Sequence, residues 1–239
     1  MAVQPWRKGI VTEIRDETPG TRIFRIRIPE LESFDFIPGQ FITLDLPIHE
    51  KVNKRWRSYS IASDPDGSNT VELVISLNVN GLGTPYLFNE VKPGHELSFR
   101  GPQGVYKLEQ PVEKPVFMVC TGTGIAPFRS MLRHLRRHRI PHKEIYLIFG
   151  CRTAADLLYA EEMRTLEKDM EGFRYIPVLS RAQWEGRTGY VHAVYEELCR
   201  NRPDASFYLC GWKAMLDEAK QRIAALGYTK TDIHLESYG

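Results

Sequence analysis

The sequence predicts two domains of different architecture, an antiparallel β-barrel in residues 1–109 followed by a parallel α/β domain in residues 110–239. The length of 239 residues is enough for two modest domains. In the first part, short strand-like segments are separated by turn signals, and in the second part apolar runs alternate with helical patterns. The segment Glu109–Pro115, which has two prolines and three charged residues, is the predicted linker.

The barrel prediction depends on a period of two in the hydrophobic pattern. Residues 41–46 begin apolar and then alternate, and residues 71–79 alternate apolar side chains with Glu72, Ser76 and Asn78. This predicts one long strand over residues 71–79. Turns are predicted where glycine and proline gather, at Pro38-Gly39, Asp64–Gly67, Pro93-Gly94 and Gly101-Pro102.

The α/β prediction depends on five apolar runs with helical patterns between them. The runs are Val116–Val119, Ile145–Phe149, Phe173–Leu179, Phe207–Cys210 and Ile233–Leu235. Helices are predicted from Phe128 and over Leu158–Met170, Val191–Cys199 and Ala214–Leu226, the last ended by Gly227. Such alternation predicts a parallel sheet that is covered on both faces.

Composition excludes several classes of function. The net charge of +2 is too small to indicate binding to nucleic acid, and no apolar stretch approaches the ~18 residues of a membrane span. The N-terminus lacks a secretory signal, so we expect a cytoplasmic protein. The four cysteines match neither a zinc motif nor a plant-type iron–sulfur motif, so we expect no metal site.

A glycine-rich segment, Thr121–Pro127, follows the first apolar run and precedes a helix. Glycines let backbone N–H groups approach a pyrophosphate, and a helix N-terminus favours its negative charge. Pro127 suits the first turn of the helix. The pattern G-x-G-x-x-P therefore favours dinucleotide binding, and the alternative is a tight strand-to-helix turn.

Two further segments have residues suited to anionic ligands. Ser180-Arg181 follows a predicted parallel strand, with Arg187 and Tyr190 close behind, and an arginine there can pair with a ribose 2′-phosphate. The alternative is a solvated loop arginine. In residues 55–63, strand spacing places Arg57, Tyr59 and Ile61 on one face and two serines on the other. By chemistry alone, that segment fits an ordinary edge strand.

The chain also resembles the ferredoxin–NADP reductase superfamily along nearly its whole length. The matching segments, in order, are Arg57-x-Tyr59-Ser60 with Ile61-Ala62-Ser63, Gly81-Leu82-Gly83-Thr84, Gly101-Pro102-Gln103-Gly104, Thr121–Pro127, Phe149-Gly150-Cys151-Arg152-Thr153, Cys210-Gly211-Trp212 and Glu236-Ser237-Tyr238. The resemblance implies a six-stranded FAD-binding barrel followed by a five-stranded parallel nucleotide domain. It also implies an FAD-dependent oxidoreductase.

The resemblance implies a role for particular residues in FAD binding. Arg57 is expected to hold the pyrophosphate, Tyr59 to lie against the isoalloxazine ring, and Ser60 to hydrogen-bond near flavin N5. The other residues expected to contact FAD are Ser58, Gly81, Gly83, Thr84 and, from the C-terminus, Tyr238.

The resemblance also implies a nicotinamide dinucleotide site in the second domain. The residues expected to bind NADP(H) are Gly122, Thr123, Gly124, Pro127, Arg152, Ser180, Arg181, Arg187, Tyr190 and Cys210. Ser60, Cys210 and Glu236 are the expected catalytic residues, which shape the place where hydride passes between nicotinamide C4 and flavin N5. For Cys210, the alternative is a small buried hydrophobic residue.

The expected activity is electron exchange between NADPH and a separate carrier protein such as ferredoxin or flavodoxin. Two alternatives stay open. One is an NADH-dependent reductase component of a multicomponent oxygenase, which the segment Trp184–Val191 resembles. The other is a non-catalytic regulator that binds flavin or nucleotide, against which the retained Ser60, Cys210 and Glu236 argue. We expect a monomer, with basic residues before Arg57 steering an acidic partner.

Overall fold

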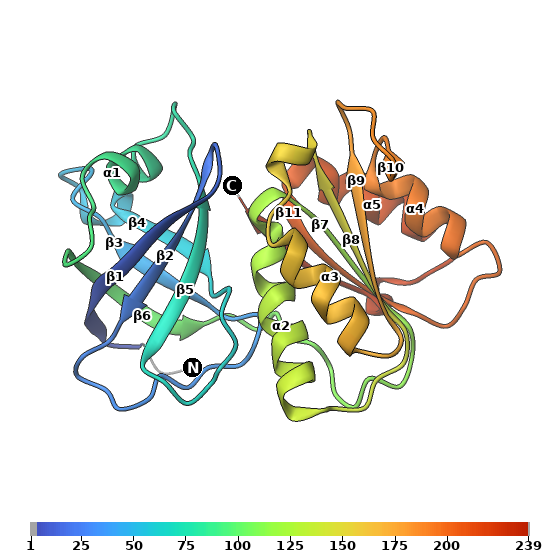
Figure 1. Cartoon of the computed structure of the whole chain (residues 1–239), viewed down its shortest axis with the longest axis horizontal. Coiled ribbons are helices and arrows are strands. Elements are labelled where there is room, and N and C mark those ends of the chain that lie inside the picture. The colour runs from blue at the N-terminus through green and yellow to red at the C-terminus, as the bar shows by residue number, and fades with distance from the viewer. Residues whose placement is uncertain (1–3, 239) are drawn as a thin grey trace. The chain divides into compact units, whose positions relative to one another are not determined.

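A computed structural model describes residues 4–238, and the chain divides into two compact units (Figure 1). The first unit contains the residues up to Lys107 together with Arg129–His134. The second contains Leu108–Phe128 and the residues from Leu135 onward. No helix in residues 4–238 is long and apolar enough to cross a membrane.

The first unit is built around an antiparallel six-stranded sheet that closes into a barrel, as the resemblance implies. Its strands are β1 (Trp6–Thr18), β2 (Thr21–Arg27), β3 (Phe41–Asp45), β4 (Trp56–Ser60), β5 (Thr70–Ser76) and β6 (Glu96–Gln103). Their order is β4-β3-β6-β1-β2-β5. A bridge between Ile61 and Leu73 joins the two edges, and the Ala62 N–H donates to the Glu72 carbonyl over 2.8 Å.

The barrel interior is a single apolar cluster that includes Phe24, Ile42, Leu44 and Phe99. The short helix α1 (Gly83–Asn89), which the sequence patterns did not predict, places Leu87 in this cluster. Seven residues are too few for a helical period to stand out, so this helix depends on its packing for stability. A 3₁₀ turn, η1 (Val52–Lys54), precedes β4.

The prediction for β5 was wrong in two respects. The strand ends at Ser76, and Val79, which the alternation placed inside it, is 74% exposed. Glu72 is buried, because the guanidinium of Arg129 lies 2.9 Å from its carboxylate and Arg129 also donates to the Ala62 carbonyl over 2.8 Å. A buried carboxylate requires such a partner, and the partner is remote in sequence, so local periodicity could not reveal it.

The second unit contains a parallel six-stranded sheet. Its strands are β7 (Val116–Thr121), β8 (Ile145–Cys151), β9 (Phe173–Leu179), β10 (Arg187–Thr188), β11 (Ser206–Trp212) and β12 (Ile233–Tyr238). Their order is β10-β9-β8-β7-β11-β12. The five predicted strands are present, and the sixth, β10, has only two residues, both exposed.

Helices cover both faces of this sheet (Figure 1). They are α2 (Ile125–His138), α3 (Ala160–Asp169), α4 (Val191–Leu198) and α5 (Lys213–Ala225), with 3₁₀ turns at η2 (Gly122–Gly124), η3 (Ala154–Asp156) and η4 (Lys230–Asp232). An apolar cluster joins α4 and α5 to one face of the sheet.

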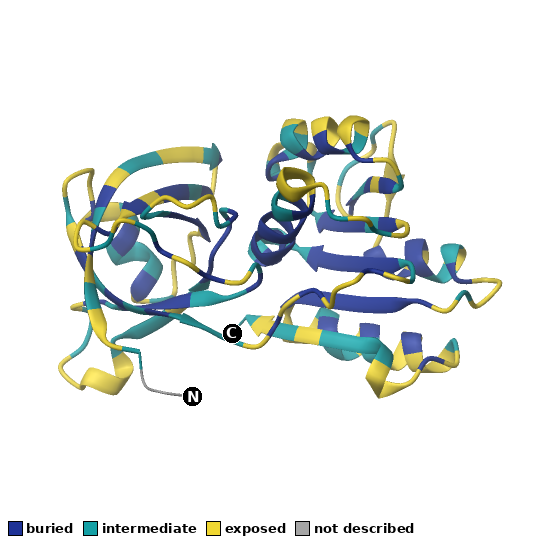
Figure 2. Ribbon diagram, turned by 90° about the horizontal axis from the view of Figure 1, so that it is seen from below, coloured by how far each residue is buried: buried dark blue, intermediate teal, exposed yellow. Residues whose placement is uncertain are grey.

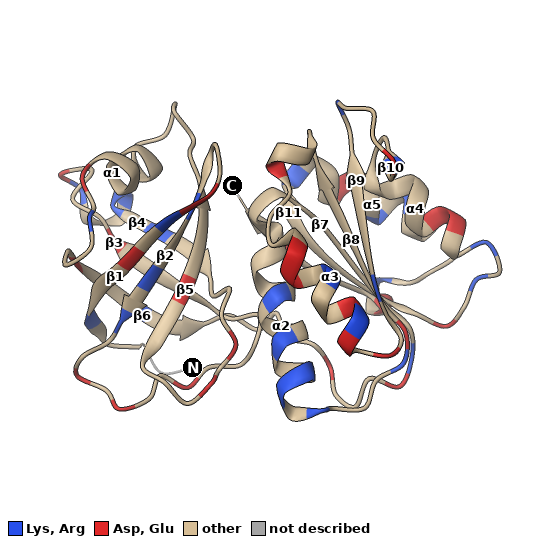
Figure 3. Ribbon diagram, viewed as in Figure 1, with Lys and Arg blue, Asp and Glu red and all other residues tan. Residues whose placement is uncertain are grey.

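The central strands of the parallel sheet are buried along almost their whole length (Figure 2). Strands β7, β8 and β11 contain no charged residue, whereas the helices have many (Figure 3). When helices cover both faces of a sheet, functional side chains can reach a ligand only from the strand ends. In such folds, ligands bind at the carboxyl ends of the strands.

Candidate functional site: a flavin motif and a nucleotide edge

In the first unit, β4 presents its side chains alternately to two environments. Its register against β3 pairs Arg57 with Leu44 and Tyr59 with Ile42, so these four side chains share one face. Tyr59 packs against the barrel core. Burial raises the pKa of Tyr59 well above its ordinary value, so the phenol is neutral at physiological pH.

Arg57 meets a glycine that leaves it room. A Cβ placed on Gly83 would lie 3.0 Å from Arg57 Cγ and 3.2 Å from its Nε. The guanidinium donates to the backbone carbonyls of Lys54 and Trp56, over 3.0 and 2.7 Å. Within residues 4–238 no carboxylate pairs with it. A cation without a counter-ion beside a glycine turn is suited to a phosphate ligand.

The other residues of the predicted flavin set are held by the protein itself. Thr84 closes the turn after β5, since its hydroxyl accepts from the Asn78 N–H over 2.8 Å and donates to the Asn78 carbonyl over 3.2 Å. The Gly81 N–H donates to the same carbonyl over 3.0 Å. The turn therefore presents backbone, rather than a free Thr84 hydroxyl, to a ligand.

The two serines of β4 differ in their surroundings. Thr43 donates to the Gln103 side chain over 3.0 Å, so its oxygen is left to accept from Ser58, whose hydroxyl lies 3.0 Å away. Ser58 is thus part of a hydrogen-bonded chain on the barrel surface. Ser60, at the end of the strand and paired with Phe41, is only 4% exposed.

In the second unit, the glycine-rich segment forms the start of α2. Gly122 has a φ of 53°, in the left-handed region, and a Cβ on Gly124 would lie 2.3 Å from the Cys210 carbonyl oxygen. The helix has no side-chain cap at its N-terminus, and Pro127 is in its first turn. A helix N-terminus without a side-chain cap and the close backbone approach suit a pyrophosphate.

Cys210 on β11 is paired with Glu236 on β12. Two residues further along the same strands, Trp212 is paired with Tyr238. Cys210 is fully buried, which raises its pKa well above the ordinary value although a hydrogen bond with Tyr238 acts in the other direction. The thiol is therefore neutral at physiological pH.

Two residues of this edge, Gly211 and Thr121, lie in matching segments of the sequence but are not among the expected site residues. Gly211 has a φ of 149°, and a Cβ there would lie 2.7 Å from Thr121 Oγ1. That hydroxyl oxygen is buried and has no hydrogen-bond partner within residues 4–238. The sequence could have indicated Gly211 through its place directly after Cys210. It could have indicated Thr121 through its place at the end of a strand.

The end of β9 is tied to the end of β8 by the backbone. Ser180 and Arg181 donate their N–H groups to the carbonyls of Cys151 and Arg152, each over 2.9 Å. This places the exposed side chains of Arg152 and Arg181 on neighbouring strand ends, and neither forms an ion pair within residues 4–238.

Arg187 and Tyr190 are placed differently. The Arg187 guanidinium forms two hydrogen bonds with the Glu197 carboxylate of α4, one of them 3.1 Å long. Its charge is therefore offset by a partner. Tyr190 is 74% exposed directly before α4.

Comparisons with known proteins agree with both halves of this description. An oxidoreductase FAD-binding domain model matches residues 8–108, and an oxidoreductase NAD-binding domain model matches residues 118–221. A ferredoxin–NADP reductase B of Sorangium cellulosum is 33% identical over 98% of both chains. The anthranilate 1,2-dioxygenase electron transfer component of Acinetobacter baylyi is 28% identical, and the match covers 96% of this chain but 66% of that protein.

Solved structures resemble the whole chain. The cytochrome P450 reductase GcoB of Amycolatopsis aligns with a TM-score of 0.87 at 28% identity, over 99% of this chain and 71% of that one. A ferredoxin–NADP reductase of Neisseria gonorrhoeae, solved with FAD and NADP, aligns with a TM-score of 0.81 at 25% identity, over 97% and 98%.

The two domains define a flavoprotein oxidoreductase that uses FAD and a nicotinamide dinucleotide. The chain belongs to the ferredoxin–NADP reductase superfamily. Its residues fit these cofactors: within residues 4–238 no carboxylate pairs with Arg57, which lies beside Gly83, and neither Gly124 nor Gly211 has room for a side chain.

Proposed function

We propose that this protein passes electrons from NADPH to a separate one-electron carrier protein of the ferredoxin or flavodoxin class. The observation that supports NADPH is the pair of exposed guanidinium groups, Arg152 and Arg181, on neighbouring strand ends. A 2′-phosphate is the group that distinguishes NADPH from NADH, and arginines bind phosphate through parallel hydrogen bonds. Arg187 contributes less, because Glu197 already holds it.

The residues of the chain position the cofactors. When bound, FAD accepts a hydride from a nicotinamide and releases electrons singly. Tyr59 offers a neutral aromatic face, and the neutral thiol of Cys210 offers a polarisable surface without a charge. Glu236, beside Cys210, is the carboxylate expected to hold or move a proton at this site.

A separate carrier is supported by the charge that precedes β4. Lys51 and Lys54, exposed before β4, provide positive charge for an acidic partner. If this charge steers the partner, added salt slows carrier reduction steeply but leaves reduction of a small neutral dye unchanged. Equal sensitivity of both would exclude steering.

A second candidate is the NADH-dependent reductase component of an oxygenase. It is favoured by the relatives of that kind, such as the phenol hydroxylase P5 protein of Acinetobacter pittii. This chain spans about two thirds of their length, whereas it matches the Sorangium cellulosum reductase from end to end. We place the NADPH-dependent reductase of a carrier protein first, because the exposed Arg152 and Arg181 suit a 2′-phosphate.

The test is the rate of flavin reduction by NADPH and by NADH in a stopped-flow spectrometer, with Arg181→Ala as the variant. We expect NADPH to be preferred, and Arg181→Ala to lower kcat/KM for NADPH about 10- to 100-fold with little change for NADH. Arg174→Ala is the matched control, because Arg174 is an exposed arginine near the start of β9, whereas Arg181 follows the end of that strand. A wild-type preference for NADH would favour the oxygenase alternative.

A further inference from the structure

The connection between β9 and β10 is unusually short for the strands it joins. The two strands run parallel, with Val178 paired to Arg187 and Leu179 paired to Thr188. Parallel neighbours normally need a crossover of about a dozen residues or more. Here only residues 180–186 connect them, without a helix, so the chain leaves the sheet and returns within a tight loop.

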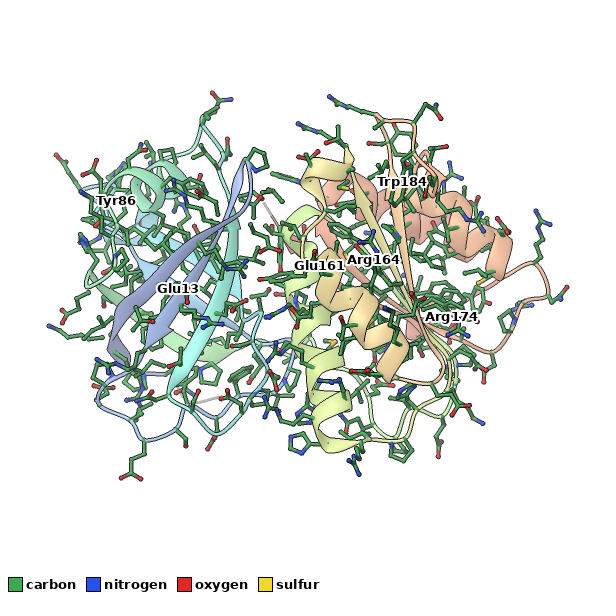
Figure 4. All side chains as sticks on the ribbon, viewed as in Figure 1. Glu13, Tyr86, Glu161, Arg164, Arg174 and Trp184 are labelled. Atoms are coloured by element: carbon green, nitrogen blue, oxygen red, sulfur yellow. The ribbon has the colours of Figure 1, made fainter. Side chains whose placement is uncertain are left out.

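Trp184 occupies the inside of this loop and is labelled in Figure 4. Its indole N–H donates to the Arg187 carbonyl over 2.7 Å. Its ring lies against Gly186, where an added Cβ would be 2.4 Å from the nearest ring carbon. The side chain therefore folds back onto the residues that follow it, and it ties the middle of the loop to Arg187, the first residue of β10.

The two ends of the loop are fixed in other ways. Arg181 N–H is bonded to the Arg152 carbonyl, and Gly189 N–H is bonded to the Leu179 carbonyl over 2.9 Å. Between these anchors, the hydrogen bond of the Trp184 indole is the only one that residues 182–186 form with the described residues. Trp184 is thus the internal support of the loop.

The loop that Trp184 supports carries two exposed side chains, Arg181 and Tyr190, at the carboxyl edge of the parallel sheet. Arg181 follows the end of β9 by two residues, and Tyr190 follows the end of β10 by two residues. If the return of the chain were not held, the register of β10 and the position of Arg181 would both become variable, since a two-residue strand contributes little pairing energy of its own.

We propose that Trp184 is a positioning residue: by closing the return from β9 to β10, it holds Arg181 in place for the 2′-phosphate and so sets the preference for NADPH over NADH. This proposal rests on the proposed function. Trp184 is not required to touch the nucleotide, and it acts through Arg181.

The experiment compares Trp184→Leu, Trp184→Phe, Arg181→Ala and the double variant Trp184→Leu/Arg181→Ala, all purified with FAD. We expect Trp184→Leu to lower kcat/KM for NADPH about tenfold, through KM, with kcat and NADH use unchanged. Trp184→Phe keeps a ring but loses the N–H, so its loss is smaller. In the Arg181→Ala background, Trp184→Leu has no further effect. Trp6→Leu, which removes an exposed tryptophan of the barrel, is the control.

A second measurement needs no nucleotide. Arg181 and Arg187 are trypsin sites in the loop, and both should be cut faster in Trp184→Leu than in the wild type. Unchanged cleavage would overturn the proposal, as would equal losses with both nucleotides or losses that add to those of Arg181→Ala. A wild type that oxidises neither nucleotide would instead contradict the proposed function, and with it the role of Trp184 in nucleotide choice.

Discussion

Two stretches at the carboxyl edge of the parallel sheet are held in shape in different ways. In the turn at Gly122–Gly124, Gly124 packs directly on the Cys210 carbonyl, and the neighbouring Gly211 packs against the Thr121 hydroxyl. The loop from Ser180 to Tyr190 is shaped by side chains, with Trp184 folded inside it and Arg187 paired to Glu197. Added atoms should therefore disturb the first stretch more than the second, and the second should depend on the Trp184 side chain.

The difference lies in what surrounds each glycine. The Cβ that Gly124 lacks would meet the Cys210 carbonyl at 2.3 Å, and that carbonyl belongs to a central strand of the sheet. The Cβ that Gly186 lacks would meet the Trp184 ring, which is a side chain in an exposed loop. Rigid backbone cannot yield without moving the sheet, whereas a ring can rotate.

The largest expected effect comes from Gly124→Ala. The added methyl group forces the start of α2 away from β11, so we expect a loss of about 1–3 kcal/mol in unfolding free energy and loss of nucleotide binding by at least about tenfold. Urea unfolding and calorimetric titration with NADP⁺ measure the two effects.

Gly20→Ala is the matched control for this change, because an added Cβ there meets nothing within 4 Å. It should leave both quantities near the wild-type values. A Gly124→Ala protein that binds the nucleotide normally would show that the turn does not need its close packing.

Gly186→Ala is expected to have the next largest effect. The methyl group pushes the indole off its position and weakens the bond to Arg187, so kcat/KM for NADPH should fall about threefold, while unfolding free energy changes by less than about 1 kcal/mol. Stopped-flow reduction with both nucleotides tests this. Equal stability losses in Gly186→Ala and Gly124→Ala would remove the contrast between the two stretches.

These two stretches also differ in how far the sequence predicts them. The glycine turn is visible because its residues are contiguous and their chemistry is general: glycine, glycine and proline between a strand and a helix. The loop is not, because its support is a tryptophan whose partners follow it by two and three residues in no regular element. Its arginines look equivalent in the sequence, and only the fold shows that Arg187 has Glu197 as a partner ten residues later.

The same limit applies to the barrel. Alternation and turn signals predict its strands, but they do not predict that Glu72 is buried, because its partner Arg129 is 57 residues away in the sequence. Helix α1 is too short to have a period. The roles of Arg57, Tyr59 and Cys210 came from the resemblance and from the order of motifs, since neither spacing nor composition singles these residues out.

Arg187→Ala should have a smaller effect than either glycine variant. The Arg187–Glu197 pair is about half exposed, so its loss should lower the unfolding free energy by less than about 1 kcal/mol. Because Glu197 already offsets the charge, the ratio of NADPH to NADH efficiency should stay within about twofold of the wild type. A fall in this ratio as large as that of Arg181→Ala would show that Arg187 exchanges Glu197 for the phosphate when NADPH binds.

The smallest expected effect is a change in how the unfolding free energy depends on pH. It comes from His192, in the first turn of α4 just after the loop. The imidazole is buried, with the Tyr195 hydroxyl 2.9 Å from Nδ1 and the Glu218 carboxylate 3.4 Å from Nε2. Burial lowers its pKa, although Glu218 and Glu196 raise it in part and Arg222 lowers it further. The folded state therefore binds fewer protons than the unfolded state as pH falls below about 6.5.

It follows that the stability contributed by neutral His192 is present above the unfolded pKa and is lost as pH falls through the folded pKa. Urea unfolding of the wild type and of His192→Gln between pH 8 and pH 5 measures this term. The wild type should lose more free energy of unfolding than the variant over that interval, and two parallel curves would show that His192 is not buried as a neutral group. Gly124→Ala removes no titratable group, so its curve should run parallel to that of the wild type. The predicted difference in pH dependence is thus specific to His192, and the substitution in the glycine turn leaves it unchanged.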